Sequence, residues 1–143
     1  MSSRPKKSDE ECLHELTYYT LAHPDPSFIH QHVVDAYAAQ HADEATKPIT
    51  IVFALLGLYL HVEKHFTGRQ VQKAHMQLAR YRREWVRPAL PEERGAMTIG
   101  DVVAATPEER DAHIHQWCAS VWQAWAMSHK QIKDLARTEL GID

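Results

Sequence analysis

A long apolar run in the middle of the chain constrains the fold more than any other feature. Residues 49–60 carry no charge, and Gly57 is the one residue among them that favours turns. A helix that is apolar on every side is one that other helices surround. The run is shorter than the roughly 18–20 apolar residues that a membrane-spanning helix needs. We therefore predict a buried central helix over about residues 49–66 and no membrane partner.

Start and stop signals divide the rest of the chain into helices. Ser8 and Glu11 have the spacing of a capping box, and Pro24 ends the helix that they start. Further helices are expected over about 25–41, 70–86 and 106–140, with a short one at 101–105. We predict an all-α fold: a helical bundle of four main helices plus a short helix, packed around the central apolar helix.

The last of these helices is expected to be continuous. Its buried positions recur at alternating spacings of four and three residues over about five heptads, which is typical of the seam of a helical bundle. These positions are Ile114, Cys118, Val121, Trp125, Ser128, Ile132, Leu135 and Glu139.

The composition is that of one globular domain. The chain has 143 residues, of which 44% are hydrophobic and 24% charged, enough for one core. We treat 1–143 as a single helical domain in which residues 1–7 form a frayed N-terminal arm. Cys12 and Cys118 are isolated and no signal peptide precedes them, so we expect reduced thiols and a cytoplasmic location.

The charge distribution argues against nucleic acid as a partner. The net charge is −3, which gives no overall attraction to a polyanion. Residues 64–87 contain seven basic side chains and one acidic one. Five of the basic residues form a stripe on the helix predicted there: Arg69, Lys73, Arg80, Arg83 and Arg87. A solvated helix face has the same composition, so the stripe alone does not predict binding.

Eleven histidines raise the expectation of a metal site. His61 and His65 are four residues apart near the end of the predicted central helix, where two imidazoles would project side by side and could chelate one ion. A third ligand would come from another helix; the candidates are His30, His32 and His129. The ion would be zinc, nickel, iron or manganese. The alternative is that His61 and His65 cover apolar surface at the solvent-exposed end of the helix.

Large aromatic residues gather in the last helix. Trp122, Trp125 and His129 lie within two turns of each other. Such side chains are anchors for a core or for a subunit interface. A ligand pocket walled by the tryptophans, with His129 as its polar group, is the functional alternative.

Three short motifs, each present once in the chain, carry a resemblance to other sequences. They are His30-x-x-x-Val34-x-x-Tyr37-x-x-Gln40-His41, Met97-Thr98-Ile99-x-Asp101-Val102 and Val121-Trp122-x-Ala124-Trp125-x-x-x-His129. The pattern resembles an uncharacterised bacterial all-helical domain-of-unknown-function family. The resemblance implies an all-helical cytosolic protein and brings no known reaction. It also suggests a shared site or core made by His30, Tyr37, Gln40, His41, Trp122, Trp125 and His129, whereas His61 and His65 lie outside the motifs.

Two functions from different classes therefore remain open. The first is a helical bundle that binds a divalent metal or a small ligand through its histidines. The second is a non-enzymatic module that forms a homodimer, or binds another partner, through the tryptophan-bearing last helix. The sequence assigns no reaction in either case.

Overall fold

The structure is a computed structural model that describes residues 7–23, 25–80 and 83–143. Within these ranges the regular secondary structure is helical throughout, which confirms the all-α prediction. The elements are α1 (Asp9–Ala22), α2 (His30–Gln40), α3 (Pro48–Val62), α4 (Gly68–Leu78), α5 (Ile99–Ala104), α6 (Pro107–Ala124), η1 (Ala126–Ser128) and α7 (His129–Leu140). Residues 1–6 of the predicted N-terminal arm lie outside the described residues.

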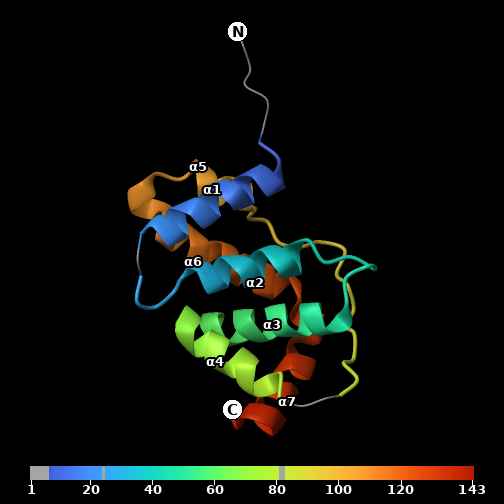
Figure 1. Cartoon of the computed structure of the whole chain (residues 1–143). Coiled ribbons are helices and arrows are strands. Elements are labelled where there is room, and N and C mark those ends of the chain that lie inside the picture. Colours follow the sequence, from blue (N-terminus) through green and yellow to red (C-terminus); the bar gives the residue numbers. More distant parts are fainter. Residues whose placement is uncertain (1–6, 24, 81–82) are drawn as a thin grey trace.

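The helix α3 lies at the centre of the molecule. It contacts α2, α4, α6 and α7, while α1 and α5 pack together at one end (Figure 1). Nine of its fifteen residues are buried: Ile51, Val52, Ala54, Leu55, Leu56, Gly57, Leu58, Tyr59 and Leu60. The predicted burial of this segment is therefore confirmed. Pro48 begins the helix, in the first turn, where a missing N–H costs nothing.

Side-chain caps fix several helix starts. Ser8 with Glu11 forms the predicted capping box at α1. Two further boxes, at Thr67 and Thr98, start α4 and α5 and were not predicted. The helix α6 begins at Pro107 as expected, although Thr106 makes no side-chain cap bond.

The start of α2 differs from the prediction. It begins at His30 rather than near residue 25, because Asp25 caps a turn that precedes the helix. The Asp25 carboxylate accepts from the backbone N–H groups of Ser27 and Ile29 at 2.9 and 3.1 Å. This turn lies against the start of α4, where the Arg69 N–H group donates to the Ser27 carbonyl at 3.1 Å.

The helix predicted over 70–86 is shorter than expected. α4 ends at Leu78, and residues 83–98 follow as irregular chain. Arg83 pairs with Glu139 of α7, and Trp85 packs edge-on against Phe53 with ring centroids 5.4 Å apart. Continuation of the helix would also align Arg83 with Arg80 and Arg87 at a repulsive spacing. The predicted basic stripe therefore does not lie on one continuous helix.

The last helix is broken into two. α6 ends at Ala124, a 3-10 turn spans Ala126–Ser128, and α7 runs in a new direction past α3 and α4 (Figure 1). A continuous helix over 106–140 would extend about 50 Å, far beyond its partner helices. The bend keeps both halves on the core, since Trp125 and Ile132 are 1% and 0% exposed. The prediction of one continuous helix is wrong, although most of the predicted seam is buried.

No helix in the described part of the chain combines the length and the apolar character that crossing a membrane requires.

Candidate functional site

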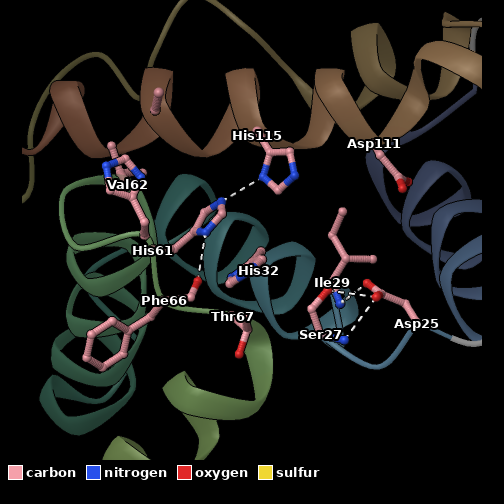
Figure 2. Close-up of a pocket in the computed structure, with 12 residues that line it drawn as sticks. Asp25, Ser27, Ile29, His32, His61, Val62, Phe66, Thr67, Asp111 and His115 are labelled. Atoms are coloured by element: carbon pink, nitrogen blue, oxygen red, sulfur yellow. Dashed lines mark hydrogen bonds between the residues drawn. The ribbon is translucent and has the colours of Figure 1, made fainter.

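Three histidines from three helices meet in the wall of one cavity. His32 comes from α2, His61 from α3 and His115 from α6 (Figure 2). The cavity has a volume of about 510 Å³. Its other lining residues are Asp25, Ser27, Ile29, Val62, His65, Phe66, Thr67, Asp111 and Ala119.

His61 is the middle member of the cluster. Its Nδ1 lies 3.2 Å from the carbonyl oxygen of Phe66 and its Nε2 lies 2.8 Å from Nδ1 of His115 (Figure 2). A carbonyl oxygen can only accept, so Nδ1 of His61 carries the proton. In the neutral ring Nε2 then holds the lone pair, and it faces His115.

His32 lies against one face of the His61 ring. The two rings are stacked, with centroids 3.6 Å apart and planes 18° apart. His32 is only 3% exposed, and its Nδ1 has no hydrogen-bond partner in the described structure. The stack with His61, rather than a polar contact of Nδ1, sets the orientation of this ring.

Burial keeps two of these imidazoles uncharged. It lowers the pKa of His32 to about 3, and nearby positive charge on His61 and His115 acts in the same direction. Burial also lowers the pKa of His61 to about 4, against the opposing effect of the hydrogen bond to the Phe66 carbonyl. At neutral pH both rings are therefore neutral, which is the form that has a nitrogen lone pair to donate.

His115 was missed by sequence reasoning. It is exposed on α6, next to the buried seam residue Ile114. The available signal was Asp111-x-x-x-His115, whose spacing of four puts a carboxylate and an imidazole on one helix face. Both residues line the cavity.

The predicted side-by-side arrangement of His61 and His65 on one helix is wrong. α3 ends at Val62, and His65 follows in the left-handed region with φ 58°. His65 nevertheless lines the same cavity. Of the three candidate third ligands, His32 lies against His61, whereas His30 and His129 have other partners: Nδ1 of His30 lies 2.9 Å from the Thr20 hydroxyl, and His129 stacks on Trp122.

The motif residues on α2 make separate structural contacts. Tyr37 stacks on His41, whose Nε2 lies 2.8 Å from a carboxylate oxygen of Asp9. Gln40 accepts from the indole N–H of Trp117 at 2.9 Å and donates to the Met97 carbonyl at 2.8 Å. None of these side chains lines the histidine cavity.

The tryptophans of the last motif belong to the core of the chain itself. Trp122 and Trp125 are 0% and 1% exposed. The Trp122 indole N–H donates to Glu63 at 2.6 Å, and its ring stacks on His129 with centroids 3.8 Å apart. The seven motif residues therefore do not form one pocket, and the indoles are not exposed anchors for a second chain.

The described residues, as they stand, contain no group of three or more His, Cys, Asp or Glu side chains that could hold a metal ion. The stacked His32 ring explains this, because nearly parallel imidazoles direct their in-plane lone pairs alongside each other rather than at one point. His61 and His115 are joined by a hydrogen bond: because Nδ1 of His61 carries the proton of that ring, its Nε2 accepts from the Nδ1–H group of His115 at 2.8 Å.

Comparison with known proteins places the chain in a family. The profile of a family described as "Family of unknown function (DUF5946)" matches residues 7–126. The chain belongs to this family. The resemblance predicted from the sequence motifs is thus confirmed at the level of a family of unknown function. The DUF5946 match includes His32, His61 and His115 and ends before His129. No curated protein and no solved structure matches the chain.

Proposed function

We propose that this DUF5946 protein binds one divalent transition-metal ion through His32, His61 and His115. The observation that carries the proposal is the approach of His61 Nε2 to His115 Nδ1, at 2.8 Å, in the wall of a cavity that His32 also lines. Two imidazoles that bind one tetrahedral ion at about 2.0–2.1 Å hold their nitrogens roughly 3.3 Å apart. Binding would replace this hydrogen bond: the proton on Nδ1 of His115 would move to Nε2 of the same ring, and a small movement of the exposed His115 side chain would give that separation.

The third ligand requires a ring rotation. The His32 ring would have to rotate away from the face of the His61 ring, so that one of its nitrogens points at the ion. Its Nδ1 makes no hydrogen bond that this rotation would break. Binding would also relieve the cost of an imidazole that is buried with an unpartnered nitrogen.

The Phe66 carbonyl supports the proposal as an outer-shell contact. Metal-binding histidines usually donate their second ring N–H to a carboxylate or carbonyl oxygen, which fixes the tautomer. His61 makes this contact through Nδ1 and so presents Nε2 as the ligand atom. An imidazole set favours zinc, nickel or iron over manganese, which prefers oxygen ligands.

The cavity beside the histidines supports an open position on the proposed ion. Structural zinc sites are closed by four protein ligands, whereas catalytic ones keep a position for water or substrate. Three imidazoles beside about 510 Å³ of space correspond to the second type. A metal there would polarise a bound carbonyl or lower the pKa of a bound water.

Zinc titration of chelator-treated protein, followed by calorimetry, tests the proposal. We expect about one ion per chain, and metal analysis of the purified protein should give the same ratio. His61→Ala and His115→Ala should weaken binding by more than the roughly 10–100-fold that loss of an outer-shell contact costs. Circular dichroism checks that each variant is folded.

His113→Ala is the matched control. His113 lies on the same helix two residues from His115, but its Nδ1 bonds the Glu109 carbonyl and it does not line the cavity. This variant should bind zinc like the wild type. Absence of stoichiometric binding by the wild type, or an equal loss in His113→Ala and His115→Ala, would overturn the proposal.

A further inference from the structure

A second cavity lies beside the turn that precedes α2. It has a volume of about 420 Å³, and half of the side chains in its wall are apolar. Its polar members include His30 of α2 and Arg69 of α4. It shares Asp25 and Ile29 with the histidine cavity, but none of the three histidines of the proposed metal site lines it.

The turn lies directly on the first residues of α4. The Arg69 N–H group donates to the Ser27 carbonyl at 3.1 Å. A Cβ atom at residue 68 would lie 1.7 Å from the Phe28 carbonyl oxygen, so the turn approaches α4 at a point where only glycine fits. These contacts hold the backbone of Arg69 next to Phe28.

Phe28 has an uncommon backbone conformation. Its φ is 60°, in the left-handed region that a residue with a Cβ rarely adopts. Its ring contacts both polar groups: the guanidinium carbon of Arg69 lies 4.7 Å from the ring centroid, and the His30 ring meets it edge-on with centroids 5.9 Å apart. Strained backbone at a cavity wall is a pointer to function. Here it places one aromatic ring against a guanidinium and an imidazole.

The exposed guanidinium of Arg69 is available to an anion. None of the ion pairs among the described residues includes it. Asp25 also lines the cavity, but its carboxylate is engaged by the turn: Oδ1 accepts from the N–H and the hydroxyl of Ser27 at 2.9 and 2.7 Å, and Oδ2 accepts from the Ile29 N–H at 3.1 Å (Figure 2).

His30 contributes a hydrogen-bond acceptor. The Thr20 hydroxyl donates to the Thr17 carbonyl at 3.1 Å, so it accepts from the Nδ1–H group of His30 at 2.9 Å. Burial lowers the pKa of His30, which keeps the ring neutral at pH 7 and leaves a lone pair on Nε2. The bond to Thr20 orients the ring, and Nε2 is the nitrogen left for a ligand.

We propose that this cavity binds a small organic carboxylate that also carries a hydroxyl or N–H donor. The Arg69 guanidinium pairs with the carboxylate, because its fork of N–H donors matches two carboxylate oxygens. The body of the ligand lies against Phe28 and Leu21, and its donor group bonds Nε2 of His30. A few polar groups in a partly apolar wall are typical of small-molecule sites. This site requires no metal.

The three isomers of hydroxybenzoate, with benzoate and phenol, are the probes. The isomers place the hydroxyl at three distances from the carboxylate, and the other two compounds each lack one group. Amide NMR shifts of the full chain, with chelator present, give the affinities and should change most at residues 20–30 and 67–70. At least one isomer should bind about threefold or more tighter than benzoate, and about tenfold or more tighter than phenol, since bonds to a charged group contribute more than bonds between neutral groups.

Arg69→Met and Lys73→Met form a matched pair. Both remove one positive charge from an exposed position of α4, but Lys73 does not line the cavity. Arg69→Met should weaken the binding of the hydroxybenzoate and of benzoate by about tenfold or more and leave phenol unchanged. Lys73→Met should bind like the wild type. His30→Phe keeps an aromatic ring and removes the acceptor, so it should abolish the preference for the hydroxybenzoate over benzoate.

Each measurement has an outcome that overturns the proposal. These outcomes are an absence of shifts at millimolar concentrations of every probe, an equal loss in Arg69→Met and Lys73→Met, and an unchanged preference in folded His30→Phe. Inorganic phosphate that shifts the same amides as strongly as the hydroxybenzoate would show a general anion site and would also overturn it. Failure of the wild type to bind zinc bears on the metal site alone, because these titrations contain chelator.

Discussion

A Cβ atom at residue 57 would lie 1.9 Å from Oδ2 of Asp35, so α2 and α3 cross at a point where only glycine fits. Asp35 is 3% exposed, and its Oδ1 accepts from the Gln31 side chain at 3.1 Å. Its Oδ2 has no partner within the described structure. The close approach of α3 to the buried Asp35 carboxyl is therefore possible because residue 57 is a glycine and has no side chain.

Gly57→Ala should destabilise the protein although alanine is the better helix former. The added methyl group meets both Asp35 and Val71, whose Cγ1 would be 3.2 Å away. Overpacking of this kind costs about 1–3 kcal/mol. Urea unfolding measures the loss. In an Asp35→Ala background the methyl group has more room, so the cost of Gly57→Ala should fall by at least about 0.5 kcal/mol in the double-mutant cycle. Equal costs in the two backgrounds would contradict the assigned clash.

The stability contributed by Asp35 should decrease as pH rises. Burial raises the pKa of this carboxyl well above its ordinary value of 3.8, against the opposing hydrogen bond from Gln31. Between the unfolded and the folded pKa, the folded state holds a proton that the unfolded state has lost. Stability therefore falls with pH in this window, by up to about 1.4 kcal/mol per unit.

Asp35→Asn removes that dependence. The free energy of unfolding of the variant, minus that of the wild type, should grow from pH 4 upwards in urea titrations with chelator present. Asp25→Asn is the contrasting variant, because hydrogen bonds, led by that from Ser27, lower the pKa of Asp25 below 3.8. The stability that Asp25 adds is lost as pH falls through its folded pKa, so the gap between Asp25→Asn and the wild type should close in acid. A flat difference for Asp35→Asn over pH 4–7 would show that Asp35 ionises normally.

Gln40→Ala should loosen the segment that follows α4. The Gln40 side chain joins the Trp117 indole to the carbonyls of Met97 and Arg94. Its loss leaves a buried N–H without a partner, at a cost of about 1–3 kcal/mol. Limited proteolysis should cut residues 91–97 faster than in the wild type, while Gln116→Ala, at an exposed position on α6, should leave the cutting rate unchanged. Equal rates for the two variants would contradict the role of Gln40.

His129→Ala should weaken the junction between α6 and α7. The His129 Nε2–H group donates to the Trp122 carbonyl at 2.8 Å, and the ring covers the indole. Loss of one hydrogen bond and one aromatic stack should cost about 1–3 kcal/mol. Amide exchange should then speed up in α7 more than in α2. His14→Ala, at an exposed position of α1, serves as the control; a uniform change across all helices would count against a local effect.

The elements that sequence alone predicted well are those whose signals are local. The uninterrupted apolar run identified α3 as buried, and Ser8 with Glu11 identified the start of α1. The end of α4 could not be found in this way, because residues 79–87 contain no helix breaker. The chain leaves the helix there to place Arg83 on Glu139 and Trp85 on Phe53, which are contacts between distant segments.

The histidine site was only partly predictable for the same reason. His61 and His32 were both predicted as candidate ligands, yet no sequence pattern favours His32 over His30 or His129. His65 was assigned to a helix because nothing between residues 61 and 67 signals an ending: the left-handed position is filled by histidine instead of glycine. The partner that completes the cluster, His115, lies 54 residues from His61, and only the packing of α6 on α2 and α3 brings them together.

The bend after Ala124 has a practical meaning for work on this family. The DUF5946 match stops at residue 126, inside the turn, yet α7 supplies the cover for one side of α3. Lys133 lies over the Tyr59 ring, and Leu135 shares a cavity wall with Val52. A fragment cut at the family boundary would leave that side of the most apolar helix in water and should aggregate, so the unit to express for zinc measurements extends through residue 143.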